Sequence, residues 1–138
     1  MRTQRLAAEL LHRIDTRSAL IGIIGLGYVG LPLAIAVARS GFHVVGFDID
    51  PLKPERLNAG TSYIDAVSQA DLAAARTTGC FRATVNMTEL SACHIVIICV
   101  PTPLTRHREP DLTYVEATAR TIATHLAPGR LVEVAPVV

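Results

Sequence analysis

The sequence lacks a dominant charge of either sign, and this absence excludes two classes of partner. Its 138 residues carry 13 basic and 12 acidic groups, which gives a formal net charge of +1 at pH 7. The basic residues form no block, so the sequence carries no electrostatic footprint for nucleic acid or for an anionic membrane surface. We therefore expect no nucleic-acid partner and no membrane partner.

Cysteine is also scarce. The chain has three cysteines, Cys80, Cys93 and Cys99, with no CxxC pair and an odd total that does not suggest a disulfide framework. Free cysteines fit a reducing compartment, so we expect a cytoplasmic protein. None of the three has a base partner, and Cys99 lies inside a β-branched run, which favours structural roles over nucleophilic ones. We expect no catalytic residue among them.

Metal-ligand patterns and targeting segments are missing as well. The five histidines have no histidine or carboxylate partner at metal-ligand spacing, so we expect no metal site; they are His12, His43, His94, His107 and His125. Charged residues interrupt the first eighteen positions, where an export signal would need an apolar core. Residues 19–38 are uncharged and long enough to suggest a transmembrane helix, but four glycines and Pro32 in this stretch favour a different interpretation.

The sequence does contain an alternation of short apolar runs and helical patterns. Half of its residues are hydrophobic, and a chain of this length buries roughly two thirds of its unfolded surface when it folds as one domain. Strands are predicted at residues 20–24, 42–48, 81–85, 94–100 and 131–134. Helical segments are predicted at residues 1–17, 31–39, 51–58, 65–78, 88–92 and, capped by Asp111, up to about residue 126.

This order predicts an α/β fold of the Rossmann type, which is a doubly wound parallel sheet with helices on both faces and strand order 3-2-1-4-5. The run HIVIICV at 94–100 is typical of a strand buried on both faces near the centre of such a sheet. Residues 101–110 contain three prolines and should form a loop at the carboxyl end of that strand, where ligands bind. We divide the chain into an amphipathic helix at 1–18 and a Rossmann domain at 19–138.

The motif GLGYVG at residues 25–30 lies between the first predicted strand and the helix that follows it. Gly25 permits the tight turn, Gly27 lets a pyrophosphate approach the backbone, and Gly30 lets helix and strand pack closely. Asp48 follows about twenty residues later, where its carboxylate can accept both ribose hydroxyls. The acidic group would repel a 2′-phosphate, and Ile49 rather than an arginine comes next, so NAD is favoured over NADP. The alternative is an ordinary turn before a buried helix.

Four segments in order, GLGYVGLPLA, FDID, ICVPTPL and REPDLTYV, resemble the amino-terminal NAD-binding domain of the UDP-glucose/GDP-mannose dehydrogenase family. The likeness covers about residues 19–132 and is greatest to the UDP-N-acetylglucosamine or UDP-N-acetylmannosamine 6-dehydrogenase branch. The resemblance implies that Tyr28 and Val29 line the NAD pyrophosphate, that Asp48 and Lys53 hold the adenosine ribose, and that Thr102 faces the cofactor. Lys53 is the only lysine of the chain, and the alternative for it is a solvated side chain.

Members of this family oxidise the C6 alcohol of a nucleotide sugar to a carboxylate in two NAD-dependent steps, using a cysteine of a separate substrate domain. The chain ends before such a motif, and its last five residues depart from the family's E-S-T-T-like run. We therefore expect a fragment that binds NAD, is inactive alone and meets a UDP-sugar only in a full-length form. A sheet truncated at its carboxyl end exposes a face through which the chain could associate, for example as a homo-oligomer.

Three alternatives stay open. A stand-alone nucleotide-binding or protein-interaction module could dock a partner through Leu6, Leu10 and Ile14 of the amino-terminal helix. Another βαβ dehydrogenase family is possible by fold, although the VPTP and REPD segments argue against it. The charged residues 106–109 could meet a nucleotide-sugar phosphate, and a solvated loop explains them equally well.

Overall fold

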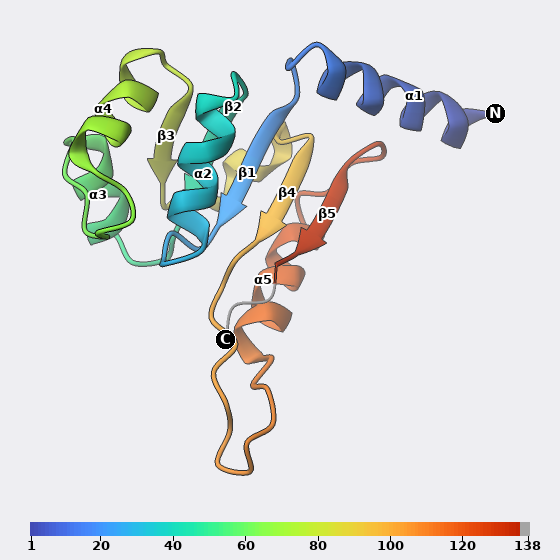
Figure 1. Cartoon of the computed structure of the whole chain (residues 1–138). Helices are drawn as coiled ribbons and strands as arrows, with labels where there is room; N and C mark the ends of the chain where they lie inside the picture. Colours follow the sequence, from blue (N-terminus) through green and yellow to red (C-terminus); the bar gives the residue numbers. More distant parts are fainter. Residues whose placement is uncertain (136–138) are drawn as a thin grey trace.

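The computed structural model describes residues 1–135, which fold around a five-stranded parallel sheet (Figure 1). The strands lie side by side in the order β3-β2-β1-β4-β5. They are β1 (Leu20–Ile24), β2 (His43–Phe47), β3 (Phe81–Thr84), β4 (Ile95–Ile98) and β5 (Leu131–Val134). The predicted doubly wound sheet and its strand order are confirmed. The last three residues of the tail that departs from the family's run, 136–138, lie outside the described part of the chain.

Helices cover both faces of this sheet. One buried cluster receives side chains from α2 (Gly30–Arg39), α3 (Leu52–Asn58) and α4 (Gln69–Thr77). The other receives Ile122 of α5 (Thr113–Ala123) and Leu90 of the 3-10 helix η1 (Met87–Ala92). The sheet is therefore the middle layer of three, as the alternation of strands and helices predicts.

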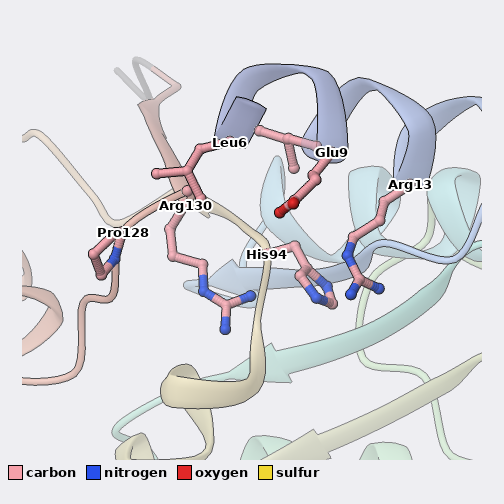
Figure 2. A pocket seen from close by; sticks show the side chains of 8 residues that line it. Leu6, Glu9, Arg13, His94, Pro128 and Arg130 are labelled. Carbon is pink, nitrogen blue, oxygen red and sulfur yellow. The ribbon is translucent and has the colours of Figure 1, made fainter. Parts of the chain in front are cut away.

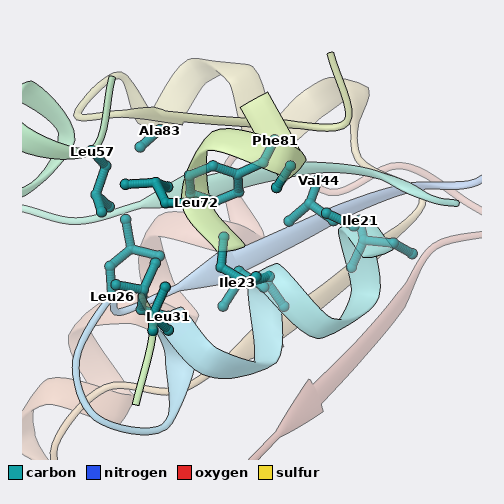
Figure 3. Packing of buried hydrophobic residues seen from close by; sticks show 14 of the residues in the cluster. Ile21, Ile23, Leu26, Leu31, Val44, Leu57, Leu72, Phe81 and Ala83 are labelled. Carbon is teal, nitrogen blue, oxygen red and sulfur yellow. The ribbon is translucent and has the colours of Figure 1, made fainter. Parts of the chain in front are cut away.

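Successive side chains of the central strands pack alternately in the two buried clusters. Ile21 and Ile23 of β1 and Val44 of β2 pack in the first cluster, together with Leu31 of α2 (Figure 3). Ile24, the last residue of β1, packs in the second. Because side chains alternate across a strand, a strand covered on both faces needs an unbroken apolar run, and this explains the composition of β1.

Strand β4 departs in part from the prediction of a strand buried on both faces. Val96 and Ile98 are buried, whereas Ile95 and Ile97 on the opposite face are only partly covered. The next strand, β5, forms the edge of the sheet, and all four of its residues are exposed. Helix α5 covers only one face at this end, so within residues 1–135 the other face has no covering layer comparable with α2 and α4.

Two helix boundaries were predicted wrongly. Helix α4 begins at Gln69 and not at residue 65, because the Oγ of Ser68 accepts the N–H of Asp71 at 3.0 Å and starts the helix there. Helix α5 ends at Ala123, three residues earlier than predicted. The residue at its N-cap is Leu112 and not the predicted Asp111, although the Asp111 carboxylate accepts the N–H of Thr113, two residues later, at 3.0 Å.

Helix α1 (Arg2–Asp15) extends away from the sheet (Figure 1), and none of its residues is fully buried. Its apolar residues Leu6, Leu10 and Ile14 are half-exposed. After the helix, Arg17 adopts a left-handed backbone conformation with φ of 57°. The Nε of Arg17 donates to the carbonyl of Ser40 at 2.7 Å, which ties the end of α1 to the end of α2.

Candidate dinucleotide site

The glycine turn between β1 and α2 is closely packed at its two ends. Gly25 has φ of +95°, a left-handed conformation that favours glycine, and a Cβ there would lie 2.6 Å from the carbonyl oxygen of Cys99. A Cβ on Gly30 would overlap the carbonyl oxygen of Gly25. The roles expected of these two glycines, a tight turn and close packing of helix on strand, agree with this geometry.

The middle of the turn is open. A Cβ on Gly27 would meet no atom within 4 Å, so the backbone there faces free space. Tyr28 is 85% exposed and Val29 is 40% exposed. Within residues 1–135, the N–H groups of Tyr28, Val29 and Gly30 have no acceptor. Unpaired N–H groups and the positive end of the α2 dipole form the arrangement that binds a phosphate.

Asp48 stands at the carboxyl end of β2 and is only 8% exposed. Its Oδ2 accepts the N–H of Leu26 at 2.9 Å, and its Oδ1 accepts the N–H of Asp50 at 3.0 Å. The Nζ of Lys53 lies 3.5 Å from Oδ2. A carboxylate has about four lone-pair positions, so Asp48 can still accept hydroxyl groups while it holds the turn. The structure thus brings the predicted Asp48 and Lys53 together beside the glycine turn.

Tyr63 belongs to this site, and the sequence reasoning missed it. Its hydroxyl donates to the carbonyl of Leu26 at 2.5 Å, and the guanidinium of Arg56 lies over its ring, 5.5 Å from the centroid. Burial is the largest cause that raises the pKa of Tyr63 well above its ordinary value, and the charge of Asp48 adds to it. Both backbone polar groups of Leu26 are therefore held, one by Asp48 and one by Tyr63.

Thr102 lies in the loop that follows β4, as predicted, and is half-exposed. The loop leaves the sheet next to the glycine turn, since the N of Val100 would lie 3.0 Å from a Cβ on Gly25. The charged residues 106–109 further along the loop are exposed and form no salt bridge within the described part of the chain. The geometry favours neither of the two interpretations given for them.

The cysteines lack the surroundings that activate a nucleophile. Burial raises the pKa of Cys93 to about 11 and also raises the pKa of Cys99. Cys80 is half-exposed. Among residues 1–135 there is no group of three or more His, Cys, Asp or Glu side chains placed to hold a metal ion. No helix in that range is long and apolar enough to cross a membrane.

A glycine turn at a helix start, with a buried carboxylate at the end of the next strand, defines a dinucleotide-binding α/β domain. Residues 19–136 match the NAD-binding domain of the UDP-glucose/GDP-mannose dehydrogenase family. The chain belongs to this family and comprises its NAD-binding domain.

Several curated relatives are similar in sequence to this chain. The chain is 41% identical over 115 residues to a UDP-N-acetyl-D-mannosamine dehydrogenase of Escherichia coli K12, covering 83% of the chain and 27% of the relative. It is 36% identical over 112 residues to a UDP-N-acetyl-D-glucosamine 6-dehydrogenase of Pseudomonas aeruginosa, covering 81% of the chain and 26% of the relative. The chain thus spans about a quarter of the length of these relatives.

Solved structures agree with the sequence matches. The fold matches a UDP-D-ManNAc dehydrogenase from Pyrococcus horikoshii with a TM-score of 0.79 and 36% identity, over 85% of this chain and 28% of that one. It matches a ternary complex of a GDP-mannose dehydrogenase from Pseudomonas aeruginosa with a TM-score of 0.78 and 30% identity, over 86% of this chain and 28% of that one. The resemblance expected from the four sequence segments is confirmed.

Proposed function

We propose that the glycine turn, Asp48 and Lys53 hold NAD in a dehydrogenase that oxidises C6 of a UDP-N-acetylhexosamine. The observation that carries the cofactor assignment is the open backbone at Gly27, next to N–H groups that have no acceptor among residues 1–135. When bound, NAD supplies the hydride acceptor of the reaction. The chemistry of these residues fits the cofactor, because donors face the place of a dianionic pyrophosphate and an acceptor faces the place of a diol.

Each side chain of the site has a separate task in this proposal. Tyr28, Val29 and Gly30 offer N–H groups to the pyrophosphate, and the exposed Tyr28 ring borders it. Asp48 accepts the ribose hydroxyls, and Lys53 holds the carboxylate from the side at 3.5 Å. Thr102, in the loop after β4, faces the cofactor from across the turn, as in the family that the chain resembles.

The nature of the sugar is inferred from the relatives. UDP-N-acetyl-D-mannosamine and UDP-N-acetyl-D-glucosamine dehydrogenases are among the proteins that match at 36–41% identity. The activity would require the substrate-binding part that these longer relatives contain. We place the Rossmann domain at residues 19–138, after the amino-terminal helix. We also place the protein in the cytoplasm, where free thiols such as Cys80 stay reduced.

The interaction-module alternative has less support. Leu6, one of the three residues offered for docking a partner, already lies against the chain's own turn at Gly129, where a Cβ would be 3.2 Å from its Cδ2. The apolar stripe of α1 therefore already packs in part against the chain itself. Association through the exposed strand β5 is a proposal that sedimentation of the purified chain would test.

Calorimetric titration with NAD and NADP tests the cofactor site. We expect NADP to bind at least 100-fold more weakly than NAD, because the 2′-phosphate would meet the Asp48 carboxylate, and like charges in contact cost several kcal/mol. In Asp48→Asn, the affinity for NAD should exceed the affinity for NADP by less than tenfold. Asp50→Asn changes the exposed carboxylate two residues away and serves as the matched control, in which the ratio of the NAD and NADP affinities should be unchanged. Equal affinities of the unaltered chain for both nucleotides would refute the ribose assignment.

A second assay tests whether the 138-residue chain is inactive alone. We expect no NADH absorbance with NAD and any of UDP-N-acetylglucosamine, UDP-N-acetylmannosamine or UDP-glucose. The reason is that Cys93 and Cys99 are buried with raised pKa values, so neither presents a thiolate to trap an aldehyde. Steady turnover that disappears in Cys99→Ala would contradict this expectation and make Cys99 a catalytic residue.

A further inference from the structure

The two ends of the parallel sheet carry different arrangements of polar groups. At the starts of β4 and β5, a cavity of about 170 Å³ lies against α1, and the residues that line it are exposed or half-exposed (Figure 2). At the opposite end, where β1 and β2 finish, Asp48 is buried and Leu26 in the glycine turn is completely buried. The buried hydrogen bonds on which a ligand could depend therefore lie at the glycine turn.

Leu26 has both of its backbone polar groups bound by side chains. Its N–H donates to Oδ2 of Asp48 at 2.9 Å, and its carbonyl accepts the hydroxyl of Tyr63 at 2.5 Å. The Leu26 side chain is fixed as well, since a Cβ on Gly46 would lie 2.7 Å from its Cδ2. The peptide planes on both sides of Leu26 are thus held in one direction.

The bond from Tyr63 occupies a carbonyl that could otherwise extend helix α2. In an α-helix each carbonyl accepts the N–H four residues later, and here this pattern begins with the N–H of Leu31 on the carbonyl of Gly27 at 3.1 Å. One step earlier, the Leu26 carbonyl would accept the N–H of Gly30. It accepts the Tyr63 hydroxyl instead, and the N–H of Gly30 has no acceptor among residues 1–135.

The same bond sets the direction of the Gly27 N–H. The peptide between Leu26 and Gly27 is trans, so its N–H points opposite to its carbonyl. Since that carbonyl faces the Tyr63 hydroxyl, the N–H of Gly27 faces away from Tyr63. Within the described residues this N–H has no acceptor, and a Cβ on Gly27 would meet no atom within 4 Å. A phosphate oxygen can therefore approach it.

Tyr63 is itself held in place. The guanidinium of Arg56 lies over its ring, 5.5 Å from the centroid. The segment around it is tied by the hydroxyl of Ser62, which donates to the carbonyl of the buried Val67 at 2.5 Å. Burial raises the pKa of Tyr63 well above its ordinary value, and the charge of Asp48 adds to this effect. The hydroxyl is therefore protonated at neutral pH and available as a donor.

We propose that Tyr63 is a positioning residue for the pyrophosphate of NAD. Its hydroxyl holds the Leu26 carbonyl, and this leaves the N–H groups of Gly27 and Gly30 free for the phosphate oxygens. Tyr63 acts on the cofactor through the turn, whereas Asp48 accepts the ribose directly. The role rests on the proposed NAD site.

Two ligands distinguish a positioning role from a structural one, because adenosine contains the ribose of NAD but no phosphate. Tyr63→Phe removes the hydroxyl and keeps the ring. We expect calorimetry to show about fivefold weaker NAD binding, the effect of one ordinary hydrogen bond, and NMR titration to show a change of less than about twofold for adenosine. Asp48→Asn should weaken the binding of both ligands. Tyr114→Phe removes the same hydroxyl from an exposed tyrosine of α5 and should leave both affinities unchanged.

Two results in Tyr63→Phe would overturn the role of this residue while NAD still binds to the unaltered chain. One is unchanged NAD affinity, and the other is an equal loss of NAD and adenosine affinity, which a general loosening of the fold would produce. Failure of the unaltered chain to bind NAD would instead refute the proposed function, and the role of Tyr63 with it.

A second measurement uses the unaltered chain, in case the thermal transition shows that Tyr63→Phe does not fold. The amide proton signals of Gly27 and Gly30 should move downfield when NAD binds, because both N–H groups gain an acceptor. An unchanged Gly27 signal in the NAD-bound chain would contradict the proposed direction of this N–H.

Discussion

Gly27 and Gly30 belong to one motif, yet the structure predicts opposite effects for the same substitution at the two positions. A Cβ on Gly30 would overlap the carbonyl oxygen of Gly25, which is backbone and cannot rotate away, and would lie 3.2 Å from the Cβ of Cys99. A Cβ on Gly27 would meet nothing within 4 Å, and Gly27 does not have the left-handed φ that Gly25 has. Gly30→Ala should therefore damage the fold, while Gly27→Ala should not.

The expected magnitudes follow from these contacts. Overpacking against a rigid neighbour costs about 1–3 kcal/mol, and the overlap at Gly30 places Gly30→Ala at about 3 kcal/mol. Gly27→Ala should raise the free energy of unfolding by about 0.5 kcal/mol, because alanine restricts the unfolded chain. At roughly 4 °C per kcal/mol, the melting temperature should fall by about 12 °C in the first variant and rise by about 2 °C in the second.

Urea unfolding and calorimetry with NAD distinguish the two effects. We expect Gly27→Ala, although stable, to weaken NAD binding at least tenfold, because its methyl group occupies the place where the pyrophosphate approaches. The reasoning is refuted if both variants lose similar stability, since the difference in contacts would then have no consequence. It is refuted equally if Gly27→Ala binds NAD as tightly as the unaltered chain.

Three further predictions concern other residues. Tyr63→Phe should lower the free energy of unfolding by about 1 kcal/mol, because the carbonyl of Leu26 loses its donor. Since the pKa of Tyr63 is raised in the folded state, the unaltered chain should lose stability as the pH rises above about 10, and urea unfolding of the variant should lack this part of the loss. Iodoacetamide at pH 8 should alkylate native Cys80 well before Cys93, whose pKa is raised to about 11, and mass spectrometry of the digested chain would show equal labelling if this burial were wrong. Arg17→Asn should keep the left-handed backbone but lose the hydrogen bond to α2, so amide hydrogen exchange should quicken at least threefold in α1 and stay unchanged in β1, and uniform exchange would contradict the prediction.

The sequence by itself determined the strand order, the glycine turn and the position of Asp48. These features depend on local chemistry, because a short apolar run followed by three spaced glycines has few other folded solutions. The short apolar run at residues 20–24 predicts a strand, and β1 forms there at the centre of the sheet. The same reasoning overestimated the burial of β4, since covering Ile95 and Ile97 depends on what packs over that face and not on the strand itself.

Only the tertiary structure decided the contacts made across the chain. Tyr63 lies 37 residues from Leu26 in an irregular segment between two helices, and no periodicity or motif marks its hydroxyl as the partner of that carbonyl. The start of α4 depends on the hydroxyl of Ser68, which caps the helix, although the helical pattern of the sequence begins earlier, at residue 65. The approach of α1 to the starts of β4 and β5 likewise has no sequence signal, because Arg13 and Arg130, which line one cavity there, lie more than one hundred positions apart.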